Sequence, residues 1–452
     1  MTARIDPERV RALNSAVPRG GRFVLYWMQS THRTQENPAL RFAVERANRV
    51  HLPLVVYFGL WRSYPDSSVR HATFLLQGLR EVAASLESLN VRFVLRIERP
   101  DRGFIRLAKD AALAVVDRGY LRLHRAWYRT AQEGCPCPLH QVEGNVVVPV
   151  GTASEKEEYS AATFRPRVTR RLARFLHPVG DAVPERSSLS LDLPSLAGDS
   201  TESLLSRLGA DPSVPPSGRF VGGTSEAMRR FGEFVDRRLD GFAGSRRDPG
   251  GDGGSGMSPY LHYGQVAPWV LALRVQEETG DGPAAFLEEL IVRRELAVNF
   301  VHYNDRYDSF GALPGWAQRT LALHRDDPRE VVYGKADLVR AATHDPYWNA
   351  AQRELVTTGM MQGTMRMYWG KKILEWSDTP EEAYATALVL NNTFGLDGRD
   401  PNSYAGVAWC FGKHDRPWKE RPVFGTVRYM NARGLERKYR MDRYLERAGV
   451  PE

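Results

Sequence analysis

The sequence is poor in cysteine: Cys135, Cys137 and Cys410 are its only three. Three thiols cannot form the disulfide framework of a small secreted protein. Two of them lie in the stretch CPCP (135–138), but no second Cys pair or His cluster follows at the spacing of a zinc site. We therefore expect free thiols, no bound metal, and a reducing, cytoplasmic location.

Long hydrophobic runs are also missing. The longest, such as VRFVL (91–95) and ALAVV (112–116), are far shorter than the ~20 apolar residues that cross a bilayer. The N-terminal stretch MTARIDPERVRALNS is polar and lacks the apolar region of a secretory signal. We expect neither a membrane span nor a signal peptide.

The composition is that of an ordinary globular protein, with 42% hydrophobic and 26% charged residues. At 452 residues the chain exceeds the size at which single cores stop growing, so two domains are expected. The net charge of +8 favours a phosphate-rich partner, although many basic proteins bind no anion.

The first 180 residues alternate strand and helix patterns. This β-α-β-α-β order predicts a Rossmann-like parallel sheet covered by helices, with ligands beyond the carboxyl ends of the strands. No G-x-G-x-x-G follows the first strand, so the usual dinucleotide fingerprint is absent. The predicted strands are 22–29, 52–60, 91–97 and 112–117, and the predicted helices are 38–50, 71–90 and 104–112.

The amino-acid composition changes after residue 180. Residues 181–223 are rich in Pro, Ser, Gly and Asp, which predicts a linker over the surface. From 224 to 452 helical spacing dominates, so we expect an all-helical second domain. Its amphipathic helices are predicted at 225–242, 284–303, 336–360 and 380–394.

A glycine-rich loop, GGDGGSGMSPYLHYG (250–264), opens a helix at Ser258-Pro259. Backbone N–H groups and hydroxyls at such a position suit a phosphate or diphosphate. The alternative is a loop that is simply flexible, which is the commoner case.

The helix LEELIVRRELAVNF (287–300) places Glu289 and Arg293 on one face, four residues apart. Arg294 and Glu295 lie on adjacent faces, and Asn299 follows Glu295 one turn later. A salt-bridged surface helix is one interpretation. The apolar residues between these charges leave little surface that faces only solvent.

Tryptophans stand out in three further stretches: 343–352, 364–376 and 390–409, which hold Trp348, Trp369, Trp376 and Trp409. Aromatics at helical spacing are more often core than cofactor contacts. Here, however, the same domain also carries the phosphate-type loop and a DGRD turn (397–400).

In combination these motifs resemble the class II cyclobutane pyrimidine dimer photolyases of the photolyase/cryptochrome superfamily. The resemblance covers nearly the whole chain and is specific, because several of the shared motifs are long. They are YWMQS (26–30), VVVPVGTASEKEEYSAATFRPRV (146–168), MSPYLHYG (257–264), THDPYWNAAQ (343–352), MRMYWGKKILEW (365–376), LDGRDPNSYAG (396–406) and ERPVFGTVRYMN (420–431).

The resemblance implies an antenna-binding α/β domain (1–180), an interdomain linker (181–223) and a helical FAD-binding catalytic domain (224–452). Photoexcited FADH⁻ in such enzymes gives an electron to a pyrimidine dimer, whose ring then splits. The resemblance places Ser255, Met257 and Ser258 at the FAD phosphates, and Arg294 near the cofactor.

Arg366 and Asp397 match the pair that flanks the isoalloxazine ring. A guanidinium there favours negative charge on the reduced flavin, and the carboxylate compensates the buried arginine. Asn391 matches the asparagine that faces flavin N5.

Three tryptophans resemble the electron-transfer chain that re-reduces FAD from the surface, namely Trp369, Trp348 and Trp376. At ~1.5 Å rise per residue, Trp369 and Trp376 lie about 10 Å apart along a helix and on nearly the same side. Ordinary packing of the three indoles is the alternative.

For the lesion, Glu289 matches the carboxylate that hydrogen-bonds a pyrimidine, and Met367 and Trp409 match residues that contact the dimer. The chain departs from the family at three positions. Arg293 replaces a lesion-stacking tryptophan, Thr364 replaces a tyrosine, and Gly256 replaces an asparagine. All three are expected in the substrate pocket, while the positions expected to face the flavin are kept.

The first hypothesis is therefore a light-driven DNA-repair lyase that acts on UV-damaged DNA as a monomer. The second is a diverged flavin photoenzyme acting on another substrate, such as a small molecule. A non-enzymatic light sensor is the third; it would need a signalling tail, and the chain ends at residue 452 soon after the last shared motif. An antenna such as 8-hydroxy-5-deazaflavin is expected in the first domain.

Overall fold

A six-stranded sheet organises the first part of the chain in the computed structural model, which describes residues 5–449. The strands run in the order β1–β6–β5–β2–β3–β4; every neighbouring pair is parallel except β1 and β6, which are antiparallel. The predicted parallel sheet is confirmed, while the short strands β1, at one edge, and β6, next to it, were not predicted. Their bounds are β1 Val10–Ala12, β2 Phe23–Trp27, β3 Leu54–Leu60, β4 Arg92–Ile97, β5 Ala111–Asp117 and β6 Leu139–Val142.

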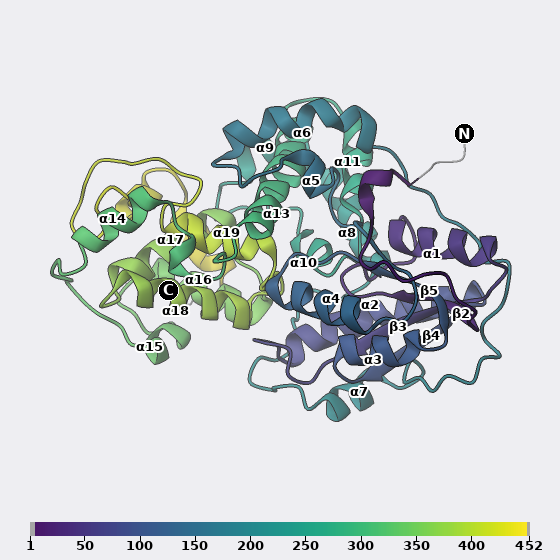
Figure 1. The fold of residues 1–452 in the computed structure, drawn as a ribbon. Coiled ribbons are helices and arrows are strands. Elements are labelled where there is room, and N and C mark those ends of the chain that lie inside the picture. The colour runs from purple at the N-terminus through teal and green to yellow at the C-terminus, as the bar shows by residue number, and fades with distance from the viewer. Residues whose placement is uncertain (1–4, 450–452) are drawn as a thin grey trace.

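Helices cover both faces of this sheet (Figure 1). Every residue of β2 is buried, because alternate side chains enter a different core on each face. Val24 and Tyr26 pack with α1 (Pro38–Arg49) and α2 (Val69–Ser88). Phe23, Leu25 and Trp27 pack with α3 (Pro100–Ala108) and α4 (Arg122–Gly134).

The predicted linker runs along the free edge of β4. Ser188 N–H donates to the Asn90 carbonyl, and Leu196 N–H donates to the Leu95 carbonyl, both at 2.9 Å. The linker also contains one helix, α7 (Thr201–Leu208), whose Leu204 and Leu208 enter the core beside α2. The linker therefore covers a sheet edge that would otherwise expose unpaired backbone groups.

The segment after β6 contacts the helical part of the chain. Helix α6 (Ala161–Phe175) packs its apolar face into the same core as helices beyond residue 224, and the short α5 (Val150–Ala153) does the same. Glu295 is buried and accepts hydrogen bonds from the N–H groups of Val147 and Val148, and burial raises its pKa to about 7. The boundary at residue 180 stays a prediction, since packing already joins the two parts before it.

Helices make up the second part, which extends to the left of the sheet in Figure 1. None of the helices within residues 5–449 has the length and apolar character needed to cross a membrane. In chain order they are α8 Thr224–Arg237, α9 Phe242–Ser245, α10 Ser258–His262, α11 Pro268–Gln276, α12 Asp281–Leu287, the π-helix η2 Glu288–Arg293, α13 Arg294–Tyr303, α14 Gly315–Leu323, α15 Lys335–Val339, α16 Pro346–Thr358, α17 Gly363–Glu375, α18 Pro380–Phe394, α19 Pro401–Cys410, α20 Ala432–Glu436 and α21 Met441–Arg447.

Two predicted helices differ from the structure. The stretch 336–360 is not one helix: α15 ends at Val339 and α16 starts at Pro346. Asp345 caps α16 by accepting from the N–H groups of Tyr347 and Trp348, and Pro346 suits the first helical position. The stretch 284–303 is continuous but contains η2, in which the Arg294 N–H reaches the Glu289 carbonyl five residues back.

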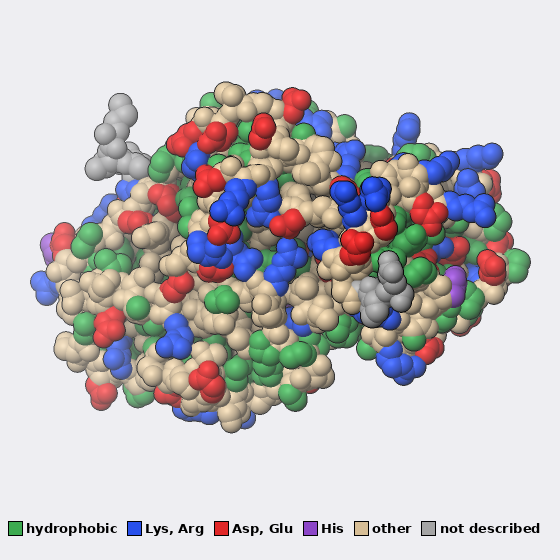
Figure 2. Space-filling model, turned by 180° about the vertical axis from the view of Figure 1, so that it is seen from behind, with side chains coloured by type: hydrophobic (Ala, Val, Ile, Leu, Met, Phe, Trp, Pro, Cys, Tyr) green, Lys and Arg blue, Asp and Glu red, His purple; other side chains and the backbone are tan. Residues whose placement is uncertain are grey.

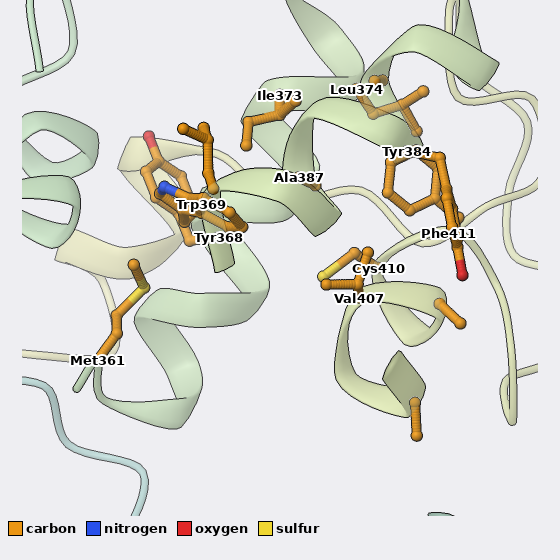
Figure 3. Close-up of a cluster of buried hydrophobic side chains, with 14 of the residues drawn as sticks. Met361, Tyr368, Trp369, Ile373, Leu374, Tyr384, Ala387, Val407, Cys410 and Phe411 are labelled. Carbon is orange, nitrogen blue, oxygen red and sulfur yellow. The ribbon is translucent and has the colours of Figure 1, made fainter. Parts of the chain in front are cut away.

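Helix α17 runs through the larger helical core. Tyr368, Trp369, Ile373 and Leu374 are all buried there, as Figure 3 shows. A helix buried on most sides is held by its neighbours rather than by its own propensity.

Candidate functional site

A pocket of about 970 Å³ opens in the helical part of the molecule. It gathers segments far apart in sequence: the glycine-rich loop, η2, the start of α17, the end of α19 and the C-terminal region. Its walls include every predicted loop and substrate residue, namely Ser255, Met257, Ser258, Glu289, Arg293, Thr364, Met367 and Trp409, together with Gly256.

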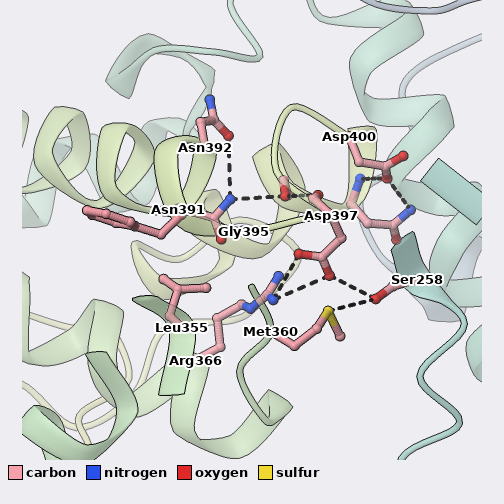
Figure 4. Close-up of polar contacts among 12 residues, drawn as sticks. Ser258, Leu355, Met360, Arg366, Asn391, Asn392, Gly395, Asp397 and Asp400 are labelled. Atoms are coloured by element: carbon pink, nitrogen blue, oxygen red, sulfur yellow. Dashed lines mark hydrogen bonds and ion pairs between the residues drawn. The ribbon is translucent and has the colours of Figure 1, made fainter. Parts of the chain in front are cut away.

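Asp397 is the centre of a polar cluster behind this pocket (Figure 4). Arg366 Nη2 donates to both Asp397 carboxylate oxygens, at 3.1 and 3.3 Å. Ser258 Oγ donates to the same carboxylate at 2.9 Å. The two charges lie almost out of solvent, with side chains 19% and 11% exposed, so each needs the other.

Asn391 joins this cluster through a residue that the sequence did not point to. Its amide donates to Ser403 Oγ at 3.0 Å, and Ser403 Oγ donates to the Asp397 carbonyl at 2.6 Å. Asn391 and Ser403 are both buried. Ser403 therefore fixes the orientation of the Asn391 amide.

The glycine-rich loop is held at Asp252 by two arginines of separate segments. Arg238 and Arg219 pair with this carboxylate at 2.8 and 3.2 Å. Gly256 has φ +70°, a left-handed conformation that glycine and asparagine adopt most easily. The glycine at this departure from the family therefore suits the same backbone shape that an asparagine suits.

Arg294 lies outside the wall of this pocket and contacts the sheet domain. Its Nη2 donates to the Asn145 carbonyl at 2.8 Å, while its buried Nη1 has no partner among the described residues. Nearby, His262 and Asp400 form a pair at 3.1 Å, and the imidazole helps to hold the pKa of Asp400 below its usual value against the opposing effect of burial.

Helix η2 presents two acid–arginine pairs to the pocket. Glu289 forms an ion pair with Arg246, a residue of the loop after α9 that the sequence did not single out. Arg293 pairs with Glu288, five residues earlier, at 3.2 Å. Glu289 and Arg293 therefore do not pair with each other, because the π-helix changes which side chains share a face.

Arg293 also covers the indole of Trp409, with its guanidinium carbon 5.6 Å from the ring centre. Such a cation–π contact contributes ~0.5–1 kcal/mol where it is partly exposed. The hydroxyl of Thr364, also in the pocket wall, donates to the Arg247 carbonyl at 2.7 Å.

The three predicted relay tryptophans are brought together in one stack. The rings of Trp369 and Trp348 are nearly parallel, at 5° and 6.4 Å between centres, and Trp348 meets Trp376 edge-on at 5.7 Å. Trp348 Nε1 donates to the Trp369 carbonyl at 3.0 Å. Trp348, from α16, thus bridges the two indoles of α17 and its C-terminal cap.

Trp376 ends this stack without reaching open solvent, because its exposed fraction is only 2%. The rings of Tyr333 and His344 lie 5.3 Å from it, and Lys372 Nζ lies 5.4 Å above its indole.

A second, smaller cavity of about 100 Å³ lies beyond the carboxyl ends of β2 and β3, where the sheet meets the helical part. Burial lowers the pKa of His32 to about 3 and that of His124 to about 4, so both imidazoles are neutral at pH 7. Its aromatic walls are Phe58, Trp61, Tyr64, Trp127 and Tyr263.

Basic side chains border the large pocket. Figure 2 shows Lys and Arg side chains gathered over the middle of one face of the molecule. Trp418 is 41% exposed, and its ring lies near the guanidinium groups of Arg416 and Arg428. Basic residues of the C-terminal region in the pocket wall include Arg428, Arg437, Lys438 and Arg447.

Comparison with known proteins adds three findings. Residues 24–186 match the family model described as DNA photolyase. A deoxyribodipyrimidine photo-lyase of Methanothermobacter thermautotrophicus is 51% identical over 444 residues, covering 98% of each chain.

Solved structures share the fold at low identity. A class III photolyase of Agrobacterium tumefaciens superposes with a TM-score of 0.74 at 18% identity, covering 96% of this chain and 87% of the other. The archaeal photolyase of Sulfolobus tokodaii, solved with two FAD molecules, gives 0.72 at 15% identity, covering 94% and 89%.

Proposed function

This chain belongs to the deoxyribodipyrimidine photo-lyases, which repair DNA with light, and on that premise we propose that it is a class II member that splits cyclobutane pyrimidine dimers. The observation that carries the proposal is the convergence of the Arg366–Asp397 pair, the pocket with Glu289 and the tryptophan stack in one helical domain. The enzyme is a carbon–carbon lyase.

The residues present fit FAD. Arg294 has a buried guanidinium nitrogen that lacks an acceptor, and a phosphate or carbonyl of the cofactor would supply one. Ser255, Met257 and Ser258 would hold the phosphates with hydroxyl and backbone N–H groups at the start of α10. When bound, reduced and excited FAD supplies the single electron that opens the dimer ring.

Arg366 and Asp397 set the charge beside the ring system. The guanidinium would favour an anionic cofactor, and Asp397 keeps that arginine from being an uncompensated buried charge. Ser258 ties the same carboxylate to the phosphate loop, so the loop and the charge pair are positioned together. Asn391, held by Ser403, would hold a hydrogen bond and control proton exchange at flavin N5.

Glu289 would accept a hydrogen bond from one pyrimidine of the flipped dimer. Its carboxylate is 41% exposed and paired with Arg246, so the lesion would share or replace this partner. Met367 and Trp409 offer an apolar and a stacking wall, which a flipped base needs. The Arg and Lys rim would bind phosphates, which makes the affinity salt-dependent.

Trp369, Trp348 and Trp376 would pass an electron inward from the outer end of the stack. The aromatic and histidine-lined cavity at the sheet edge would hold an antenna such as 8-hydroxy-5-deazaflavin, because neutral imidazoles and flat rings suit a planar chromophore. A monomer in the cytoplasm completes the proposal.

Arg293 supports a second candidate, a photoenzyme with a different substrate. It occupies the wall opposite Trp409 with a charge where the family has a stacking ring. If the lesion pocket has changed its substrate, binding to dimer-containing DNA will be weak and poorly selective.

A repair assay tests the proposal. The purified protein, with its flavin fully reduced, is illuminated with dimer-containing DNA, and the return of thymine absorbance is followed. We expect repair by the native protein and its loss in Glu289→Gln with retained flavin. No repair by the native reduced protein would contradict the first function, whereas tight, dimer-selective binding would exclude the second.

A further inference from the structure

A cavity of about 280 Å³, which shares Arg421 and Tyr429 with the wall of the large pocket, meets the outer end of the tryptophan stack. Trp376 lies in its wall, although the indole is only 2% exposed. The remaining wall comes from the loop before α15, His344 before α16, the end of α17 and the loop after α19. Any molecule in this cavity therefore lies against the outermost indole of the stack.

The cavity carries excess positive charge. Its side chains include Arg329, Lys372 and Arg421 but only two carboxylates, Glu330 and Glu375. Lys372 is neutralised by Glu375 at 2.7 Å. Neither Arg329 nor Arg421 has a carboxylate partner among residues 5–449, and Glu330 is exposed to solvent.

Arg329 contributes a guanidinium group to the cavity wall. Its guanidinium donates to the carbonyls of Ser377, Arg325 and Asp327, at 2.5, 2.8 and 2.7 Å, so it is rigidly held. Its Nη2 atom is nevertheless buried without a partner in the part of the chain described. Among the described residues Arg329 has no carboxylate partner, so its positive charge in the cavity wall favours an anionic occupant.

We propose that this cavity binds a small anionic one-electron reductant, of the ascorbate type, directly against Trp376. The inference rests on the electron relay of the proposed function and names where electrons enter it. Because Trp376 has almost no open surface, an electron donor has to reach it through a cavity such as this one.

The step balances as one electron and one proton. After the stack has passed an electron inward, Trp376 is left as an indole radical cation. The ascorbate monoanion gives one electron to that indole, which returns to its neutral form. Ascorbate loses its remaining hydroxyl proton to water and leaves as the ascorbyl radical anion.

The test compares two donors during illumination of the flavin-loaded protein without DNA. Ascorbate is anionic at pH 6.5, whereas dithiothreitol is mainly neutral there, as thiols ionise near pH 8.5. We expect the photoreduction rate to saturate with ascorbate concentration and to stay linear with dithiothreitol. In the dark, titration calorimetry with ascorbate should give a dissociation constant close to the same half-saturating concentration.

Two charge variants give opposite expected shifts. Arg421→Gln should raise the half-saturating ascorbate concentration roughly fivefold, and Glu330→Gln should lower it by a similar factor, as for one charge at ~4 Å in water. Both side chains are exposed, so neither change disturbs the core. Rates with dithiothreitol should stay unchanged in both variants.

The variant Trp376→Phe distinguishes a failure of the tryptophan relay from a failure of the anion site. If Trp376→Phe leaves photoreduction intact with both donors, the relay itself is wrong. If that variant abolishes photoreduction but ascorbate behaves like dithiothreitol in the native protein, the relay stands and the anion site is refuted. Equal responses of Arg421→Gln and Glu330→Gln would also refute it.

Discussion

Arg293 offers the sharpest test of how far the lesion pocket has changed. In the variant Arg293→Trp, a ring replaces the guanidinium beside Trp409. The change removes a half-exposed ion pair with Glu288, worth ~0–1 kcal/mol, and a cation–π contact of ~0.5–1 kcal/mol. We therefore expect the free energy of unfolding to fall by about 1–2 kcal/mol, a loss that a folded protein tolerates.

The gain is expected in DNA binding. One additional aromatic stack on a flipped base contributes roughly 1–3 kcal/mol, which is about 5- to 150-fold in the dissociation constant. The assay is fluorescence anisotropy with dimer-containing and undamaged duplexes at two salt concentrations. Only the affinity for the dimer should rise, so the selectivity ratio should rise by the same factor.

Arg165→Ala is the matched control. Arg165 pairs with the same Glu288 carboxylate at 2.8 Å but lies on α6, outside the pocket wall. Its loss removes one of the two arginines paired with Glu288 without changing the stacking surface, so DNA affinity should stay at the native value. If Arg293→Trp weakens dimer binding while Arg165→Ala does not, Arg293 is itself the lesion contact and the stacking argument is refuted.

Three further predictions address other parts of the molecule. Trp348→Phe should abolish light-driven flavin reduction, measured by absorbance, while chemically reduced protein still repairs DNA. The lost hydrogen bond to the Trp369 carbonyl should lower the free energy of unfolding by about 1 kcal/mol. Retained photoreduction would contradict the relay. The native protein keeps the Glu295 proton up to about pH 7, whereas the unfolded chain releases it near pH 4.5. The free energy of unfolding of the native protein should therefore fall by roughly 3 kcal/mol between these pH values. Urea unfolding at several pH values should show this fall in the native protein and not in Glu295→Gln. Arg428→Ala should reduce the slope of log affinity against log salt by about one unit for all DNA, because a rim arginine contacts phosphate rather than bases; an effect confined to dimer-containing DNA would place Arg428 on the lesion.

The sheet could be predicted because its signals are local. The apolar runs at 22–29 and 52–60 carry strand length and β-branched residues, and helical spacing separates them. The strands β1 and β6, which lie side by side at one end of the sheet, are three and four residues long and lack such a run, so tertiary pairing alone defines them.

In the site, residues that lie within a motif were found and those contributed by distant segments were not. Arg366 and Asp397 form the expected pair. Arg246 was missed, because an arginine in the polar stretch GSRRD gives no sign that it will face Glu289 across the pocket. Ser403 is the exception: it lies inside the motif 396–406 and was still missed, because its role depends on where α19 meets α18.

The relay shows both cases at once. Helical spacing places Trp369 and Trp376 on nearly one side of α17, about 10 Å apart along the axis. Trp348 lies between them, with its ring parallel to that of Trp369 at 6.4 Å. This position depends on how α16 packs against α17, which the spacing of residues in the sequence does not predict.

The π-helix η2 also sets how the residues before it are rotated about the helix axis relative to the residues after it. Upstream of its extra residue, Glu289 is aimed at the pocket; downstream, Glu295 and Asn299 are aimed at the segment 147–158, where both make buried hydrogen bonds. Deleting a single residue from η2 would turn everything after it by about 100° relative to everything before it. The chain could then keep either the buried hydrogen bonds to the segment 147–158 or the position of the Glu289 carboxylate in the pocket, but not both. We therefore expect η2 to tolerate substitutions far better than a change in length.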